Sequence, residues 1–468
     1  MAVYESRNPS SAPSELFDVA IVGGGVSGAA LFYALARYAS VPRLALFEKY
    51  DRPGLVNSDP HNNSQTLHVG DIETNYSVEK VRQVYPAAMM VKRYTDTLSP
   101  DRRSSIIAPV EKMVLAVGEQ EVQILKDRAA ALEAIFPELR GLDGAAIAAV
   151  EPEVMRGRRE EAVFALSNPG YAVNYGELAR SFIEEAARGT SHTQTFFGTE
   201  ITRVEAIDGG YRLSTKGGSY EARVVVFDTD AYSLHFAKQL GLGREFSLIP
   251  IAGSFYFTPQ KLNGKVYRVQ DPRMPFAAVH GDPELTEDGV TRWGPTARFY
   301  PVLEARKISS MGRFFSASGF GRLATWLSFG SILLEPVRFW YLIKNFFYDL
   351  PLVGTLLLLP QLRKVVPTLR WSEVARAQGY GGMRLQRVDV RTRELLLGEG
   401  KIVGENIIFN MSPSPGASVC LYNAMRDAET IAEFLPEIRF DKVHLLRDLY
   451  GPGRLPANDV SLPESYAS

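Results

Sequence analysis

Cysteine is nearly absent from this chain of 468 residues, in which Cys420 is the only one. A single cysteine excludes an internal disulfide, a cysteine-ligated zinc site and an iron–sulfur cluster, and it is typical of a reducing compartment. Charge of one sign is also lacking, because 52 Lys and Arg residues face 53 Asp and Glu residues. A net charge of -1 gives no indication of a nucleic-acid partner. We therefore expect neither a metal centre nor nucleic acid.

Long apolar runs and targeting segments are missing as well. Residues 1–15 are small and polar without the apolar core of a signal peptide, so we expect a disordered arm. The longest unbroken apolar run is shorter than the about 20 residues of a spanning helix. We also find no internal repeat and no low-complexity tract. These absences favour a cytoplasmic protein.

What the chain does contain is a dinucleotide-binding fingerprint close to its N-terminus. The apolar run Val19–Val22 is typical of a buried parallel strand, and Gly23, Gly25 and Gly28 follow at G-x-G-x-x-G spacing. The first glycine permits a tight turn, the second lets a pyrophosphate approach, and the third lets helix and strand pack closely. Glu48 ends a second apolar run roughly 20 residues later, where a carboxylate grips ribose hydroxyls. The combination predicts a dinucleotide site.

The rest of the chain predicts an α/β protein of α+β two-domain type. A Rossmann-like dinucleotide-binding domain is joined to a second, substrate-binding domain built on an antiparallel sheet. The expected division is an arm at 1–15, the first part of the dinucleotide domain at 16–235 with 60–150 partly inserted, the substrate domain at 236–374, the second part of the dinucleotide domain at 375–440 and a tail at 441–468.

Three segments outside the fingerprint indicate function. Residues 59–76 form a long polar stretch inside the α/β domain, and such loops are usually functional. Near the C-terminus a strand, a Ser-Pro-Gly turn and a helix again direct backbone N–H groups at a ligand, with Ser414, Gly416 and Ala417 as candidates. Residues 320–369 are helical and very apolar with flanking basic residues, which favours an interfacial membrane surface over a core or dimer interface.

Several blocks carry a resemblance to a known family. They are the fingerprint, Asn63–Tyr76, Pro275–Asp282, Gly294-Pro295, Gly381–Arg384 and Asn410–Ala417. Together they resemble the malate:quinone oxidoreductases, FAD-dependent enzymes related to flavoenzymes that oxidise L-2-hydroxyglutarate and D-amino acids. The resemblance implies oxidation of (S)-malate to oxaloacetate, with electrons passing through FAD to a membrane quinone. It also implies peripheral attachment to the cytoplasmic face of the membrane. One departure is Asp228-Thr-Asp230, where such flavoproteins often carry Ala-Thr-Gly.

Three alternatives remain open at this point. The first is another FAD enzyme of the same fold, such as an L-2-hydroxyglutarate dehydrogenase or an amino-acid oxidase. The second is an NAD dehydrogenase, although the single N-terminal fingerprint and the return of α/β composition after residue 374 favour FAD. The third is a non-catalytic lipid carrier of the same fold.

Oxidation of a 2-hydroxy acid requires a cation, a base and a hydride acceptor. Arg384, in its glycine-rich block, is the expected carboxylate-binding residue because a guanidinium binds carboxylates bidentately. Malate has a second carboxylate, for which Arg298 is a candidate. His280 is the first candidate for the base, since Asp282 can orient it, and His68 is the second. Asn63, Ser64 and Gln65 are expected to hydrogen-bond the flavin edge.

Overall fold

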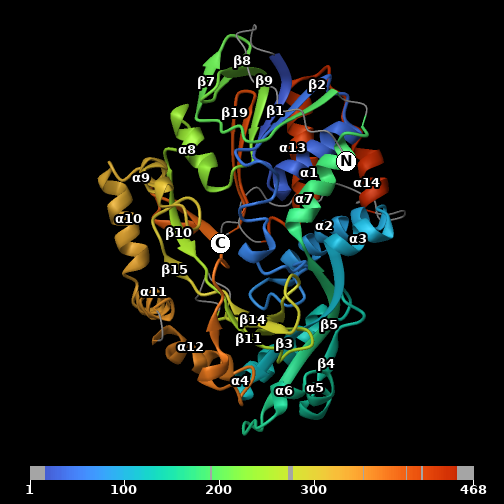
Figure 1. The fold of residues 1–468 in the computed structure, drawn as a ribbon, viewed down its shortest axis with the longest axis vertical. Helices are drawn as coiled ribbons and strands as arrows, with labels where there is room; N and C mark the ends of the chain where they lie inside the picture. The colour runs from blue at the N-terminus through green and yellow to red at the C-terminus, as the bar shows by residue number, and fades with distance from the viewer. Residues whose placement is uncertain are drawn as a thin grey trace.

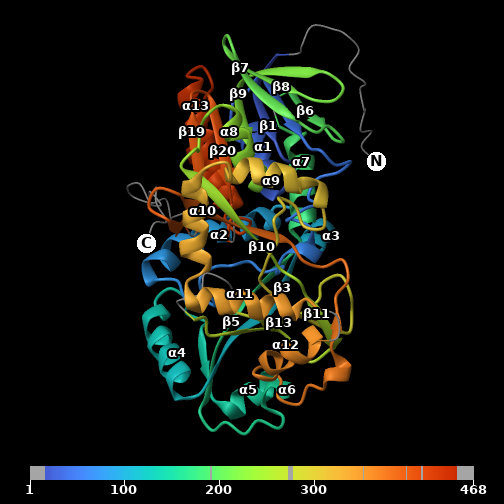
Figure 2. The ribbon, with the colours of Figure 1, turned by 90° about the vertical axis from the view of Figure 1, so that its left-hand side faces the viewer.

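The computed structural model describes most of the chain. The described residues are 16–189, 192–271, 278–350, 353–396, 398–412 and 415–450. The expected arm at 1–15 and the tail from residue 451 onward lie outside them. Within the described residues the molecule is elongated, with one sheet at one end, a second sheet at the other, and a row of helices along one side (Figure 1 and Figure 2).

The first sheet carries the fingerprint and has the strand order β19-β20-β9-β1-β2-β6. Its strands are β1 (Leu16–Val22), β2 (Arg43–Phe47), β6 (His192–Phe196), β9 (Ser219–Phe227), β20 (Ile407–Met411) and β19 (Gly400–Gly404), with the hairpin β7 (Arg203–Ile207) and β8 (Gly210–Ser214) beside β9. The run β6-β2-β1-β9-β20 is parallel. Both faces of β1 are buried from Val19 to Val22, which explains the unbroken apolar sequence of this part of the strand.

Helices cover both faces of this sheet. They are α1 (Val26–Tyr38), α2 (Val78–Asp96), α3 (Pro100–Ile106), α7 (Tyr175–Ala186), α8 (Ala231–Gln239), α13 (Cys420–Phe434) and α14 (Lys442–Leu449). The helix α1 is central, because it packs against both α7 and α13 in one continuous core. Residues 442–449 were expected to be tail, but they form α14, whose Leu445 and Leu449 are fully buried in that core.

The second sheet has the order β16-β11-β14-β13-β12-β3-β5-β4. Its strands are β3 (Ile107–Val117), β4 (Arg140–Leu142), β5 (Val163–Val173), β11 (Tyr256–Pro259), β12 (Lys265–Arg268), β13 (His280–Pro283), β14 (Val290–Gly294) and β16 (Ala375–Arg376), and α4 (Glu119–Leu132), α5 (Gly144–Val150) and α6 (Pro152–Met155) lie nearby. The sheet is antiparallel except where β12 runs parallel to β3.

A third, antiparallel sheet has the order β15-β10-β17-β18. Its strands are β10 (Phe246–Ala252), β15 (Arg298–Phe299), β17 (Met383–Asp389) and β18 (Glu394–Leu396). The row of helices beside it in Figure 2 comprises α9 (Met311–Ser318), α10 (Leu323–Leu333), α11 (Pro336–Tyr348) and α12 (Val353–Arg363). Short 3₁₀ turns occur at Pro60–Asn62, Ile308–Ser310 and Trp371–Glu373.

The predicted fold class is confirmed, whereas the sheets divide the chain differently from the expected boundaries. Strands β3, β4 and β5, from 107–173, belong to the second sheet. Strands β17 and β18 follow residue 374 but pair in the third sheet, so the return to the first sheet begins only at β19. Of the strand expected at 276–279, residues 276 and 277 lie outside the described residues, and residues 278 and 279 precede β13, which begins at His280. Strand partners lie far apart in sequence, and local pattern does not encode them.

The apolar helices expose much of their hydrophobic surface. In α11, Trp340 is 67% exposed and Phe346 is 51% exposed, whereas Tyr348 is buried. Phe329, Ile332 and Leu358, expected on the apolar surface, are buried instead. Among the described residues no single helix is long and apolar enough to cross a membrane. The pair α11 and α12 passes the length and composition test together but bends by 118° between the two helices.

Candidate active site

The glycine turn has the geometry that a dinucleotide requires. Gly23 adopts a φ of +117°, and a Cβ atom there would lie 2.3 Å from the carbonyl O of Asp228. A Cβ on Gly28 would lie 2.0 Å from the carbonyl O of Gly23. Helix and strand therefore pack too closely at Gly28 for any side chain. At Gly25 a Cβ would approach only Ser58 Oγ, at 3.5 Å. Protein packing leaves space over Gly25, which is where a pyrophosphate would approach.

Glu48 is fixed at the end of β2 by two backbone donors. Its Oε2 accepts a hydrogen bond from Gly24 N–H at 2.7 Å and its Oε1 from Tyr50 N–H at 2.9 Å. Burial raises the pKa of Glu48, and these two backbone hydrogen bonds oppose that rise. A carboxylate oxygen has more than one acceptor site, so each can still receive a ribose hydroxyl.

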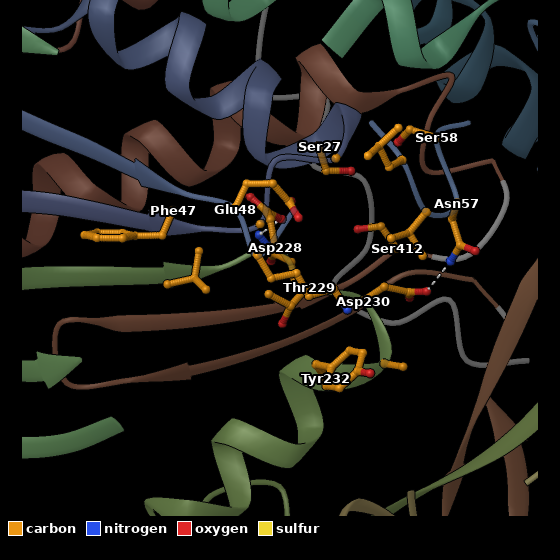
Figure 3. Close-up of a pocket in the computed structure, with 18 of the residues that line it drawn as sticks. Ser27, Phe47, Glu48, Asn57, Ser58, Asp228, Thr229, Asp230, Tyr232 and Ser412 are labelled. Carbon is orange, nitrogen blue, oxygen red and sulfur yellow. Dashed lines mark hydrogen bonds between the residues drawn. The ribbon is translucent and has the colours of Figure 1, made fainter. Parts of the chain in front are cut away.

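A single groove runs from this turn between the strand ends (Figure 3). Its lining includes Thr199, Glu200 and Arg313, and also Asn57, Ser412 and Ala417. The Val26 N–H at the start of α1 donates to Ser58 Oγ at 2.9 Å. This contact places a hydroxyl at the positive end of the helix. Open space at Gly25, an anchored ribose acid and a groove beside the helix N-terminus fit FAD.

The Asp228-Thr-Asp230 segment lines the same groove although it lacks the usual glycine. Asp230 has a positive φ of 48°. Non-glycine residues rarely adopt that conformation. Its Oδ2 accepts a hydrogen bond from Asn57 Nδ2 at 2.9 Å (Figure 3). Burial raises the pKa of Asp230 to about 6. The chain therefore makes the turn without glycine and places a titratable group beside the cofactor groove.

Of the predicted Ser-Pro-Gly turn near the C-terminus, the structure describes residues 415–418. Ala417 lines the groove and Gly416 is buried beside it, whereas Ser414 lies outside the described residues. Ser418 Oγ accepts a hydrogen bond from His68 N–H at 3.0 Å. This contact joins the start of α13 to the polar loop 59–76.

Two side chains of that loop do not fit the expected role at the flavin edge. Gln65 is fully buried, and its Nε2 donates to Glu284 Oε1 at 2.6 Å and to the Pro60 carbonyl at 3.1 Å. Asn63 Nδ2 donates to the carbonyls of Asn57 and Asp59, and its Oδ1 accepts from Gln65 N–H. Asn63 therefore bonds to the backbone of its own and the preceding segment, whereas Gln65 ties the loop to Glu284 and Leu285.

His68 lies between two oxygen atoms. Nδ1 is hydrogen-bonded to Glu73 Oε1, and Nε2 lies 3.0 Å from Ser64 Oγ. Burial alone would raise the pKa of Glu73, but His68 and the Lys112 ammonium hold it below its usual value. The carboxylate therefore stays ionised and orients the imidazole, an arrangement typical of a general base.

His280 has a different environment. Its side chain is 2% exposed, it stacks on Tyr267 with ring centroids 4.3 Å apart, and Nδ1 donates to the Ala278 carbonyl at 3.2 Å. Asp282, 3.6 Å from Nε2, also receives Arg292 at 2.7 Å. Burial lowers the pKa of His280 to about 4, and Asp282 only partly offsets this. Such an imidazole is a poor proton acceptor near neutral pH.

Arg384 is half-buried on β17, and its guanidinium forms no hydrogen bond or ion pair with another described residue. It pairs with Ile251 of β10, on the sheet face that packs against α11. Burial lowers the pKa of Arg384, and the neighbouring phenols of Tyr341 and Tyr76 partly restore it. An arginine without a nearby acid is available for a substrate carboxylate.

Arg298, the second expected substrate cation, is already neutralised. Its Nε lies 3.2 Å from the buried Asp349 Oδ2, and its guanidinium stacks on Tyr300 at 4.9 Å. Binding a substrate here would first require breaking this ion pair. We therefore assign Arg298 a structural role.

Several groove residues escaped prediction. Asn57 and Ser58 follow Glu48 at the carboxyl end of a parallel strand, a position that could have flagged them. Tyr232 and Arg313 come from α8 and α9, and nothing local in the sequence links those helices to the fingerprint. Arg313 Nη1 lies 2.6 Å from Glu200 Oε1, and both residues line the groove.

Comparisons with known proteins agree with this geometry. The family model described as "FAD dependent oxidoreductase" matches residues 18–420. The L-α-glycerophosphate oxidase of Mycoplasma pneumoniae, solved with FAD bound, has the same fold with a TM-score of 0.61 and 19% identity, covering 90% of this chain and 95% of that one. Fold and groove therefore define an FAD-dependent oxidoreductase.

Two curated relatives narrow the assignment. The probable malate:quinone oxidoreductase of Campylobacter jejuni is 40% identical, over 90% of this chain and 96% of that protein. The malate:quinone oxidoreductase of Helicobacter pylori strain J99 is 36% identical, over 92% of this chain and 98% of that protein. This chain belongs to the malate:quinone oxidoreductase family.

Proposed function

We propose that this protein oxidises (S)-malate to oxaloacetate and passes the two electrons to a membrane quinone. The observation that carries the proposal is Arg384, a half-buried cation without an acidic partner among the described residues. The glycine turn before it lies against the polar loop, because Gly381 N–H donates to the His61 carbonyl at 2.8 Å. A carboxylate-binding group and the oriented His68 therefore come from neighbouring segments. Family membership supports malate as the substrate.

Arg384 holds the C1 carboxylate of malate bidentately and fixes the orientation of the carbon that carries the hydroxyl. We assign the base to His68 in place of His280. Its imidazole accepts the hydroxyl proton, while Glu73 stabilises the imidazolium that forms. Burial lowers the pKa of His280 to about 4, which makes that imidazole a poor proton acceptor near neutral pH.

The groove holds the cofactor through the turn Gly23–Gly28, Glu48 and the start of α1. FAD supplies, when bound, the hydride acceptor and the store for two electrons that a hydroxy-acid oxidation requires. The protein contributes an anchored ribose acid, a positive helix end for the pyrophosphate, and the braced loop 59–76 that fixes the base.

We propose that the exposed face of α10–α12 attaches the protein to the membrane. Large apolar side chains project from all three helices and from the turn after α10. The most exposed are Leu323, Trp326, Leu334, Trp340, Phe346 and Leu356. Lys344, Arg363 and Lys364 lie exposed on or beside these helices. Basic groups at such positions interact with lipid headgroups. A lipid quinone would reach the enzyme from this side.

The function is tested with the purified flavoprotein under anaerobic conditions. (S)-malate should bleach the flavin absorbance, and a short-chain quinone should restore it, whereas NAD should not. L-2-hydroxyglutarate, (R)-malate and D- and L-amino acids form the comparison panel. A kcat/KM for L-2-hydroxyglutarate or an amino acid above that for (S)-malate would overturn the substrate assignment.

A further inference from the structure

Malate carries a second carboxylate, so its site requires a second cation besides Arg384. Arg298 is held by Asp349 and cannot serve without losing that pair. The loop that carries His68 ends at Tyr76, and α2 begins two residues later. The junction also interacts electrostatically with Arg384, because Tyr76 is one of the two phenols that act on the Arg384 guanidinium. A cation at the junction would therefore meet the requirement.

Lys80, in the first turn of α2, places its ammonium over the ring of Tyr76. Nζ lies 4.1 Å from the ring centroid. That separation is within the range of a cation–π contact. The lysine is half-buried, and its backbone N–H is capped by Ser77 Oγ at 3.2 Å. Burial lowers the pKa of Lys80, while the carboxylates of Glu73, the partner of His68, and Glu399 raise it. Tyr76 thus contacts the Lys80 ammonium and acts electrostatically on the Arg384 guanidinium.

The junction is fixed in place by Arg128 of α4. Its guanidinium donates to the carbonyl oxygens of Gly70 and Tyr76, each at 2.9 Å, and to that of Glu73 at 2.8 Å. These three carbonyls span the segment between His68 and Lys80. The loop therefore fixes the spacing between the base and the start of α2, which carries Lys80. A fixed spacing is required to select substrates by the distance between their hydroxyl and second carboxylate.

We propose that Lys80 is a specificity-determining residue that binds the C4 carboxylate of malate, with Tyr76 between it and Arg384. This inference rests on the proposed function. An ammonium carries three N–H donors, so it holds a carboxylate oxygen while it keeps its contact with the ring. The site then recognises 2-hydroxy acids with a second carboxylate and discriminates against monocarboxylates.

The experiment compares Lys80→Met, Lys80→Arg and the control Lys92→Met, which removes a lysine further along α2 that pairs with Asp96. Substrates are (S)-malate and (S)-2-hydroxybutyrate, which lacks the second carboxylate. In Lys80→Met we expect KM for malate to rise about 10- to 100-fold, with kcat within about threefold and 2-hydroxybutyrate kinetics unchanged. Lys80→Arg should recover part of the affinity, and Lys92→Met should resemble the wild type.

A second readout does not depend on turnover. Succinate should raise the melting temperature of the wild-type holoenzyme, and Lys80→Met should lose most of that shift while keeping its FAD content. An unchanged malate-to-hydroxybutyrate ratio in folded Lys80→Met, or in folded Lys80→Gln if the first variant does not fold, overturns the inference. If the wild type prefers another dicarboxylate and Lys80→Met selectively loses it, the malate assignment fails and the role of Lys80 stands.

Discussion

Nδ1 of His68 is hydrogen-bonded to the carboxylate of Glu73, five residues further along the same loop. Arg128 holds the intervening backbone, so the pair is a rigid unit. The competing histidine, His280, is stacked on Tyr267 and buried beside the Asp282–Arg292 ion pair. We therefore infer different tasks for the two histidines: His68 serves the chemistry, and His280 supports the sheet beneath the loop.

His68→Gln should slow flavin reduction by malate roughly 10²- to 10⁴-fold, because the base is removed while some hydrogen bonding remains. Malate binding should change little. His280→Gln should keep a rate within several-fold of the wild type and lower the melting temperature. Anaerobic stopped-flow absorbance measures both rates. A slow His280→Gln beside a normal His68→Gln would return the base to His280.

Gly25→Val and Gly28→Ala should fail in different ways. The side chain at Gly25 would occupy open groove, so Gly25→Val should fold but lose FAD. A Cβ at Gly28 would lie 2.0 Å from the Gly23 carbonyl O, so Gly28→Ala should lower the melting temperature markedly. The ratio of flavin absorbance to protein absorbance measures FAD content, and a thermal melt measures stability. Full flavin occupancy in Gly25→Val would contradict the cofactor site.

Arg384→Lys should raise KM for malate, since an ammonium cannot reproduce a bidentate contact worth on the order of 1.5–3 kcal/mol. Arg298→Met is the matched comparison on the same sheet. It should leave KM unchanged and reduce stability, because the buried Asp349 loses the closer of its two arginine partners. Steady-state kinetics give KM for malate and thermal melts give the stability of both variants. An increase in KM that occurs only in Arg298→Met would show that Arg298, and not Arg384, binds the substrate carboxylate.

Asp230→Asn should alter how stability depends on pH. Burial raises the pKa of Asp230 from its ordinary value to about 6, so the folded protein favours the neutral acid. Wild-type stability therefore falls as pH rises from about 4 through 6, and the loss persists above that window. The variant cannot ionise there, yet it keeps the contact with Asn57. Relative to the wild type it should become more stable as pH rises through that window. The melting temperatures of the wild type and the variant are measured from about pH 4 to above pH 6. A difference between the two proteins that stays constant over this range would contradict the prediction.

Replacing Trp340, Phe346 and Leu357 with serine should release the protein from membranes. These side chains are exposed on α11 and α12, so their removal costs little folding energy while the apolar surface is lost. Malate oxidation with a water-soluble dye should survive, and flotation with anionic lipid vesicles measures attachment. Replacing the buried Phe329 is the control for misfolding. Wild-type protein that stays unbound to such vesicles would contradict the membrane surface.

The sequence by itself determined the cofactor site in outline. Gly23, Gly25, Gly28 and Glu48 are adjacent to one strand pair, so local spacing specifies their geometry. The sequence also determined the family, because the motif blocks and their order along the chain can be identified without knowing which residues are in contact. Arg384 was proposed in the same way.

Only the tertiary structure decided which charged groups are available. Arg298 and Arg384 look alike in sequence, but Asp349, reached across the fold, neutralises one of them. Likewise His68 and His280 both lie in family blocks, and only their packing separates an oriented imidazole from one with a pKa of about 4. The position of Lys80 over Tyr76 and the contribution of 107–173 to the second sheet also depend on folding. Charge pairing and burial depend on contacts with residues that are distant in the chain, and the local sequence does not specify those contacts.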